Sequence, residues 1–225
     1  EQLQLAAIFE DASIVCLDTT SGKKLWRVPF PKTRIGHSVF LATDGGYLVA
    51  VGGFSNELVT KKDDGTESKR LQTWYEVMCF DSLDGKLRWR KDHSNNVHGS
   101  GGEHGEQVHH PVLRDGVLFV EPVAYHLDSG ERWNPDGGNS PWYIGARRGC
   151  GTFSASASCL YFRNHNPMAM PIGRGAKQTK ITAVSRPGCW ISILPVGGMV
   201  LLPEASSGCV CAFPVQTSMG FVPRR

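Results

Sequence analysis

One pattern occurs twice with the same spacing and decides the fold: residues 14–26 read IVCLDTTSGKKLW, and residues 77–89 read VMCFDSLDGKLRW. Each copy has a β-branched or aromatic strand, a short turn that carries glycine, and a second strand with tryptophan. A third copy, residues 125–133 (YHLDSGERW), is shorter by two residues in the turn. The pattern therefore predicts a repeated strand–turn–strand unit.

A second pattern repeats between these copies. It has the form Arg-x-Gly-[His/Cys] and occurs at residues 34–37 (RIGH), 147–150 (RRGC) and 186–189 (RPGC). Residues 106–109 (EQVH) stand where a fourth copy is expected. Each copy precedes a short alternating strand, a turn and another strand, so it marks the entry to a sheet.

A unit of about 40 residues with four short strands is typical of a β-propeller blade. We expect an all-β fold and a single, partial β-propeller domain over residues 1–225, made of four-stranded blades. About five blades are expected, roughly at 1–33, 36–92, 108–134, 149–184 and 188–224.

The first of these blades is expected to be incomplete. It has three strands (3–9, 13–18 and 24–29) and no inner strand. The polar stretch at 60–69 is interpreted as a surface loop inserted into a hairpin. A β-sandwich is the alternative fold, but it does not require the same turn and tryptophan to recur.

Composition excludes several classes of protein. The chain has 225 residues, of which 40% are hydrophobic and 26 are glycine, as in a globular protein. No apolar run approaches the ~18 residues of a transmembrane helix. A net charge of +3 gives no indication of nucleic-acid binding. Residues 1–5 lack the features of a signal peptide, and we expect the sequence to be a processed or truncated piece of a longer protein.

The turn-and-tryptophan segments LDTTSGKKLW, FDSLDGKLRW and LDSGERW resemble the repeat of PQQ-like β-propellers, which include quinoprotein alcohol dehydrogenases and cofactor-free relatives. The resemblance covers most of the chain, although the last two units lack the tryptophan. It implies seven or eight blades and an exported protein, hence missing blades or a fused domain, and a periplasmic or extracellular location.

The resemblance also implies what a dehydrogenase would contain. Such enzymes hold the quinone against a tryptophan and a vicinal Cys-Cys disulfide, with Ca²⁺ and a catalytic Asp. This sequence has no Cys-Cys pair, and Cys209 and Cys211 are separated by Val210. We therefore place the chain in the cofactor-free branch and expect no cofactor.

The residues around the entry to each inner strand are expected to converge at one mouth of the propeller channel. Glu121 and Glu204 are expected in turns between second and third strands on the same face. The candidate funnel residues are Arg34, His37, His109, His110, Glu121, Arg148, Cys150, Arg186, Cys189 and Glu204.

Three interpretations of the funnel stay open. In the first, glycine allows a tight turn and arginine binds carbonyl groups between blades, so the motif is architectural. In the second, converging arginines bind an anionic saccharide or carboxylate. In the third, His, Cys and Glu bind a metal, although no closely spaced ligand pair supports this. If Glu121 or Glu204 pairs with the arginines, the site is structural.

Other chemistry-bearing residues give weaker indications. The segment 93–110 holds five of the eight histidines and is interpreted as a mobile loop. Cys16, Cys79 and Cys211 are expected to be buried small hydrophobes. A Cys189–Cys209 disulfide is a further hypothesis.

The sequence leads to one functional hypothesis and one alternative. The hypothesis is a non-catalytic module that binds a ligand or acts as a protein scaffold, without a bound metal. The alternative is an enzyme, either a quinoprotein-type dehydrogenase or a funnel-site lyase or hydrolase that uses His109, Arg148 and Glu121. Trp26, Trp89 and Trp133 are expected at corresponding positions, packed between neighbouring sheets.

Overall fold

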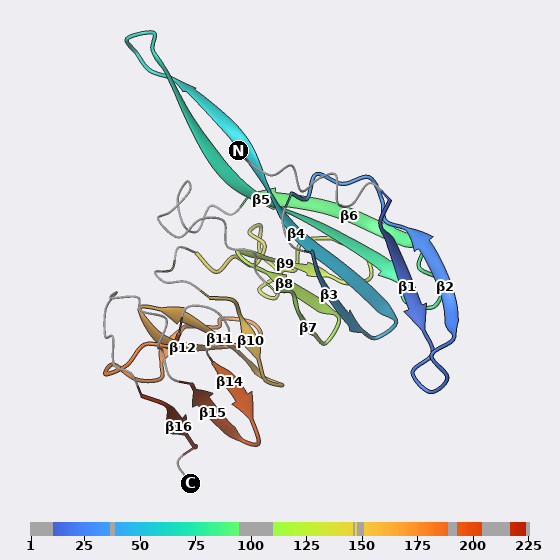
Figure 1. Cartoon of the computed structure of the whole chain (residues 1–225). Helices are drawn as coiled ribbons and strands as arrows, with labels where there is room; N and C mark the ends of the chain where they lie inside the picture. Colours follow the sequence, from blue (N-terminus) through green and yellow to red (C-terminus); the bar gives the residue numbers. More distant parts are fainter. Residues whose placement is uncertain are drawn as a thin grey trace.

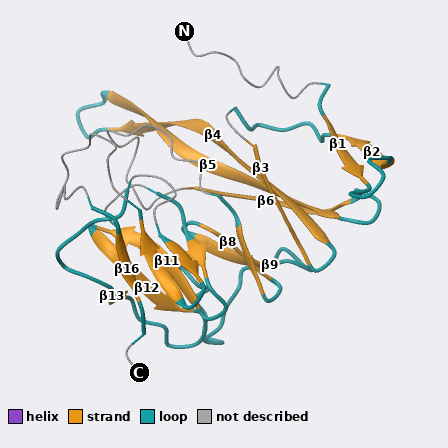
Figure 2. Ribbon diagram, turned by 60° about the horizontal axis from the view of Figure 1, so that its bottom comes forward, coloured by secondary structure: helices purple, strands orange, loops and turns teal. Residues whose placement is uncertain are grey.

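The computed structural model describes residues 11–36, 39–94, 110–145, 147, 151–188, 193–203 and 217–223. Within these ranges the chain consists of strands joined by turns, with no helix (Figure 2). The strands form five antiparallel sheets, each built from strands that follow one another in the chain (Figure 1). The expected all-β class is confirmed.

The first two sheets come from the N-terminal half of the chain. The first sheet pairs β1 (Ser13–Leu17) with β2 (Lys24–Pro29). The second sheet has four strands: β3 (Val39–Asp44), β4 (Tyr47–Lys61), β5 (Glu67–Asp81) and β6 (Leu87–Ser94).

The other three sheets follow in chain order. The third sheet contains β7 (Val112–Arg114), β8 (Val117–Val120) and β9 (Val123–His126). The fourth contains β10 (Ser154–Ala155), β11 (Cys159–Asn164), β12 (Asn166–Pro171) and β13 (Thr179–Lys180). The fifth contains β14 (Leu194–Val196), β15 (Met199–Leu202) and β16 (Met219–Phe221).

The first strands of four successive sheets lie next to one another. β3 contacts β7, β7 contacts β10, and β10 contacts β14. Sheets that meet along their first strands and follow one another in this way have the arrangement of propeller blades around an axis. The structure is thus consistent with the predicted β-propeller, whereas the number of blades and their exact limits stay predictions.

Alternate residues of one strand face opposite neighbouring sheets. In β5, Val77 and Cys79 belong to the core shared with the third sheet, whereas Met78 and Phe80 belong to the core shared with the first. β8 divides in the same way between the second and fourth sheets. Because both faces are buried, these strands are continuously apolar rather than alternating, as is usual for strands covered on both sides.

Two tryptophans join adjacent sheets by the same contact. The indole N–H of Trp26 donates to the Ser82 carbonyl at 3.1 Å, and that of Trp89 donates to the Leu127 carbonyl at 2.7 Å. Each acceptor stands three residues before a turn glycine, Gly85 or Gly130. Both indole rings therefore lie on the turn of the next sheet.

The turn glycines leave no room for a side chain. A Cβ on Gly85 would lie 2.8 Å from the Trp26 ring, and one on Gly130 would lie 2.7 Å from the Trp89 ring. Both glycines have positive φ angles, 75° and 70°. Glycine is thus required both by the backbone conformation and by the indole that packs on it.

The third repeat differs from the sequence interpretation by one residue. The N–H groups of Gly22, Gly85 and Gly130 bind the carbonyls of Asp18, Asp81 and His126, so these turns are equal in length up to the glycine. The third copy is therefore shorter by one residue, after the glycine, and not by two within the turn. The longer copies absorb the additional residue in a bulge of their strand pairing.

Trp133 lies opposite β9, at the position equivalent to those of Trp26 and Trp89, although its turn is shorter. Its N–H donates to the Ala124 carbonyl at 2.9 Å. Its ring packs against the core shared by the third and fourth sheets, edge-on to Phe119. The prediction that the three repeated tryptophans pack between neighbouring sheets is confirmed.

Two polar segments differ from the sequence interpretation. The predicted loop at 60–69 is instead the tip of a continuous hairpin, because β4 and β5 each run for 15 residues. This hairpin projects from the body of the molecule as a twisted two-stranded ribbon (Figure 1). His93, assigned to a mobile loop, lies in β6 and is buried. The predicted strand at 3–9 lies outside the described residues.

Replacing Gly130 by Asn tests the contact between indole and glycine. Asn tolerates the left-handed backbone, so the main cost comes from its Cβ against Trp89, and overpacking of this kind costs about 1–3 kcal/mol. Gly65→Asn is the matched control, because Gly65 also has positive φ (80°) and open space around it. Urea unfolding should show a clear decrease in the free energy of unfolding for Gly130→Asn and none for Gly65→Asn. Equal losses for the two variants would contradict the packing.

Candidate functional site

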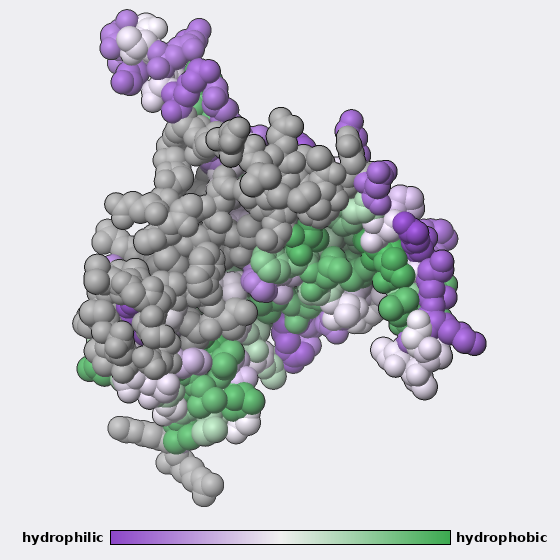
Figure 3. Space-filling view, viewed as in Figure 1, coloured by the Kyte–Doolittle hydropathy of each residue, from purple (hydrophilic) through white to green (hydrophobic). Residues whose placement is uncertain are grey.

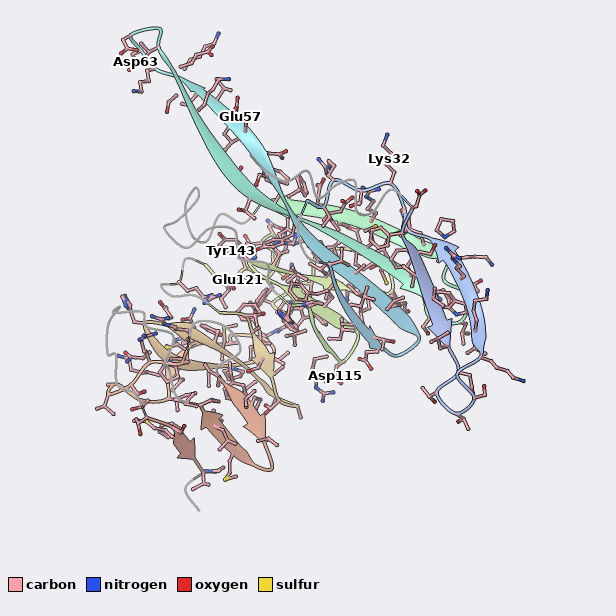
Figure 4. The ribbon with its side chains drawn as sticks, viewed as in Figure 1. Lys32, Glu57, Asp63, Asp115, Glu121 and Tyr143 are labelled. Atoms are coloured by element: carbon pink, nitrogen blue, oxygen red, sulfur yellow. The ribbon has the colours of Figure 1, made fainter. Side chains whose placement is uncertain are left out.

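The candidate site centres on a buried ion pair. Glu121, in the turn after β8, lies in the interior beside β8 and β9 (Figure 4). Its carboxylate accepts two hydrogen bonds from the Arg147 guanidinium, each 2.5 Å long, and both side chains are fully buried. This bidentate geometry is the strong form of a carboxylate–guanidinium pair.

Arg147 also binds main-chain carbonyl groups of the fourth sheet and its entry segment. Its guanidinium donates to the Arg163 carbonyl at 2.9 Å and to the Gly151 carbonyl at 2.5 Å. Glu121 belongs to the third sheet, so the arginine joins two sheets and fixes the segment that leads into β10. This is the architectural interpretation of the Arg-x-Gly motif, realised by Arg147.

A second buried contact joins the second and third sheets beside this pair. Nδ1 of His93 lies 2.8 Å from the Tyr125 hydroxyl, and Nε2 lies 3.3 Å from the Glu121 carbonyl oxygen. Burial raises the pKa of the Tyr125 hydroxyl, which favours its protonated form. Both ring nitrogens of His93 are therefore occupied by structural partners.

Glu76 plays a comparable role at the entry to β3. Its buried carboxylate accepts the Arg34 main-chain N–H at 2.9 Å and the Thr33 hydroxyl, and it pairs with Arg90. The Arg34 side chain pairs with Asp92 and lies over the Phe54 ring, 4.3 Å from its centroid. A predicted funnel arginine is thus already neutralised by a carboxylate of the chain.

His110 lies where the first strands of successive sheets meet. Its main-chain N–H donates to the Thr152 hydroxyl at 3.0 Å, and its ring centroid lies 3.8 Å from that of Phe40. Burial lowers the pKa of the imidazole, so the neutral ring is favoured near pH 7. Neutral imidazole makes His110 a poor cationic group for an anionic ligand.

Only some of the predicted funnel residues can be placed. Arg34, His110, Glu121 and Arg186 are described, and Arg186 is buried on the segment that leads into β14. The other predicted funnel residues lie outside the described part of the chain, as does the hypothetical Cys189–Cys209 disulfide; they are His37, His109, Arg148, Cys150, Cys189 and Glu204. Their convergence stays a prediction.

The Arg-x-Gly motif itself indicates the arginine that pairs with Glu121. Arg147 is the first residue of the motif at 147–150, whereas the predicted funnel contained its neighbour Arg148. A second signal points to the pair itself. Glu121 directly ends the apolar run 117–120, and a buried carboxylate requires a cation. That signal predicts a buried arginine partner without deciding which of the two it is.

The described side chains do not assemble a metal-binding cluster. Within the ranges that the structure describes, no three His, Cys, Asp or Glu side chains come together as metal ligands. Cys16, Cys79 and Cys159 are free thiols. Cys79 is buried as predicted, and burial raises the pKa of its thiol to about 12, whereas Cys16 is only half-buried.

One family model matches the chain. It is described as outer membrane protein assembly factor BamB, a PQQ-repeat family, and the match spans residues 10–164, which is more than half of the chain. No curated protein matches the chain significantly. The part of the chain that the structure describes also contains no helix long and apolar enough to cross a membrane.

Removing one partner of the buried pair should destabilise the fold strongly. Arg147→Met leaves the Glu121 carboxylate buried without its cation, which typically costs about 3–5 kcal/mol. The double variant Glu121→Leu/Arg147→Met should lose less than the single one, because no buried charge remains. Arg114→Met, at a partly exposed arginine beside Asp115, is the control. Urea unfolding of the wild type, the single variant, the double variant and the control checks this. A double variant with a lower free energy of unfolding than Arg147→Met would contradict it.

Alkylation should distinguish Cys79 from the half-exposed thiols. Its raised pKa keeps the buried thiol protonated at pH 8, and the thiolate is the reactive form. Iodoacetamide at pH 8 should modify Cys16 and Cys159 in the native protein, and Cys79 only after unfolding. The free energy of unfolding should also decrease as pH rises from about 9.0 towards 12, because the Cys79 thiol loses its proton in the unfolded protein before it does so in the folded one. Peptide mass spectrometry checks the labelling, and early modification of Cys79 would refute its burial.

Proposed function

Because the chain belongs to the PQQ-repeat family described as outer membrane protein assembly factor BamB, we propose that it is a non-catalytic β-propeller module that binds a protein partner. The name of that family refers to the assembly of outer membrane proteins. This supports a periplasmic or extracellular location, in agreement with the expectation from the repeat.

We propose that the site is not catalytic because Glu121, His93 and Arg34 bind other groups of the chain. Glu121 is fully buried and paired with Arg147, so it is not placed to transfer a proton to a substrate. Both ring nitrogens of His93 have structural partners, and Arg34 is paired with Asp92. These contacts support a structural role over the lyase or hydrolase alternative.

The same contacts favour a protein partner over an anionic saccharide or carboxylate. A small anion would have to compete with two carboxylates of the chain, the exposed Asp92 at Arg34 and the buried Glu121 at Arg147. The carboxylates are already in place and, for Glu121, out of water. A protein-binding surface has no such competitor.

The projecting ribbon is the observation that carries the proposal. β4 pairs with β3 only as far as Gly52, β5 pairs with β6 only from Trp74, and the Gly53 carbonyl accepts the Gly36 N–H. Farther out, at 57–61 of β4 and 67–71 of β5, the two strands pair with each other and with no third strand among the described residues. An extended edge is a surface to which a partner can add a strand.

The side chains of the ribbon favour specific contact over aggregation. Glu57 and Lys69 form a cross-strand ion pair at 2.9 Å, and Lys61 lies 4.0 Å from Glu67. The tip is hydrophilic (Figure 3), with Asp63 at its end (Figure 4). Charged edges resist indiscriminate pairing while leaving the main chain accessible to a matched partner.

Shortening the ribbon tests this function. Residues 57–71 are replaced by Asn-Gly, which closes a two-residue turn between the paired Asn56 and Gln72. The free energy of unfolding should change by no more than about 1 kcal/mol, because the removed residues lie outside the sheet cores. Binding of the partner should be lost.

Site-specific crosslinking identifies that partner. A photoreactive amino acid at Thr60 should capture one protein in extracts of the source organism, identified by mass spectrometry, and the same group at the exposed Leu83 should not. The shortened protein should fail to co-purify with the captured protein. Co-purification at an unchanged level would contradict the proposed role of the ribbon.

A further inference from the structure

The main chain of the ribbon points outward at every second residue. The Ser82 N–H donates to the Gly46 carbonyl at 3.0 Å, and the Lys62 N–H donates to the Thr66 carbonyl at 2.8 Å. These bonds continue the β4–β5 register at its two ends, both at even-numbered positions of β4. Because the register between them has no bulge, even-numbered residues of β4 bind β5, and odd-numbered residues direct their N–H and C=O groups away from it.

The outward-facing residues on the β4 edge of the ribbon are Glu57, Val59 and Lys61. Gly53 follows the same alternation, since its carbonyl accepts the Gly36 N–H on the side away from β5. Farther along β4, at the three outward-facing positions, no third strand pairs with β4 among the described residues. Each of these residues offers one N–H donor and one carbonyl acceptor to a strand beside β4.

The side chains at these three positions are self-complementary. They lie on one face of the strand, as alternate residues do, and all three are exposed. In chain direction they run acidic, apolar, basic, and in the opposite direction they run basic, apolar, acidic. A second β4 strand that approaches antiparallel therefore places Lys61 opposite Glu57, and Val59 opposite Val59.

We propose that the β4 edge of the ribbon, residues 57–61, is the interface of a symmetric dimer of this chain. A two-fold axis passes between the two Val59 residues, so the interface is isologous. Each Val59 N–H donates to the partner's Val59 carbonyl, and Glu57 exchanges the same pair of bonds with the partner's Lys61. The two ribbons form one four-stranded sheet in the order β5, β4, β4 and β5.

The charges within each copy fit this arrangement. Glu57 pairs with Lys69 at 2.9 Å, and Lys61 lies 4.0 Å from Glu67. Across the dimer, Glu67, Lys61 and the partner's Glu57 form a row in which the sign of the charge alternates. Opposite charges on facing strands stabilise a sheet, so the ion pairs of each copy extend into its partner.

The β5 edge of the ribbon does not have this symmetry. Its outward-facing residues include Glu67 and Lys69. Two β5 strands that overlap over residues 67–71 would centre on Lys69 and place two ammonium groups opposite each other, which is destabilising. The dimer therefore uses the β4 edge and leaves the β5 edge for the protein partner. The inference is independent of the proposed function, since it concerns contact between two copies of the chain.

Charge complementation tests the dimer. Lys61→Glu makes both ends of the edge acidic, and Glu57→Lys makes both ends basic, so two attractive pairs become repulsive in either homodimer. The interface is small and the dimer is weak, so the purified chain is studied by analytical ultracentrifugation at up to about 500 µM. Each variant should dimerise about 10-fold more weakly than the unaltered protein. An equimolar mixture of the two should recover dimerisation to within about 3-fold, because Lys then meets Glu at both ends.

Matched controls separate the ribbon from net charge. Asp44→Lys and Lys24→Glu change the charge by the same amounts at exposed positions outside the ribbon. These two variants, alone or mixed, should dimerise as the unaltered protein does. The protein in which Asn-Gly replaces residues 57–71 should be monomeric.

A cysteine at the two-fold axis tests the register. In Val59→Cys, the two Cα atoms of the dimer lie about 5.5 Å apart, within the range of a disulfide. Mild oxidation should link this variant into covalent dimers above the background given by the unaltered protein with its own cysteines. Lys69→Cys, at the centre of the β5 edge, should stay at that background.

Several results would overturn the proposal. They are a chain that stays monomeric throughout the concentration range, a dimer that survives the charge variants or the shortened ribbon, a mixture that does not recover dimerisation, and Lys69→Cys linking faster than Val59→Cys. None of them bears on the capture of a protein partner by crosslinking. Failure of that capture would leave the dimer of the purified chain unaffected.

Discussion

The contact of an indole ring with the glycine turn of the next sheet is the constraint on which the rest of this fold depends. The second and third sheets are apolar on both faces, so neither is expected to be stable in water alone. The tryptophan fixes the distance and register of neighbouring sheets by filling the space between them and by donating to a defined carbonyl. Once this contact is set, alternate side chains of each strand meet the correct neighbour.

Charged groups reinforce the same arrangement near the first strands. Glu121 and Arg147 join the third and fourth sheets, and Glu76 holds the segment before β3. A buried carboxylate or guanidinium is costly without its partner, so each pair discriminates strongly against misplaced neighbours. The consequence for function is that these groups are used in holding sheets together, which leaves exposed surfaces such as the ribbon for binding.

Much of the fold could be predicted from the sequence because the repeat has a physical cause. Glycine at a positive φ receives an indole ring at the first two interfaces between sheets, so glycine and tryptophan recur with the same spacing in the first two copies. The site was harder to predict. Arg147 and Arg148 carry the same side chain, and the predicted funnel contained Arg148 although the Arg-x-Gly spacing begins at Arg147, the residue that reaches Glu121. The ribbon has few apolar residues, so a polar run in two long strands resembled a loop, and His93 looked like its polar neighbours although it packs on Tyr125.

The central claim is that Trp26 and Trp89 lie on the glycine turns of the next sheets, and nuclear Overhauser effects test it most directly. The account predicts cross-peaks from the Trp26 ring to the Gly85 Hα protons and from the Trp89 ring to the Gly130 Hα protons. It also predicts upfield shifts of those Hα protons and slow exchange of both indole N–H groups. Random-coil Hα shifts at Gly85 and Gly130, with rapidly exchanging indole protons, would contradict it.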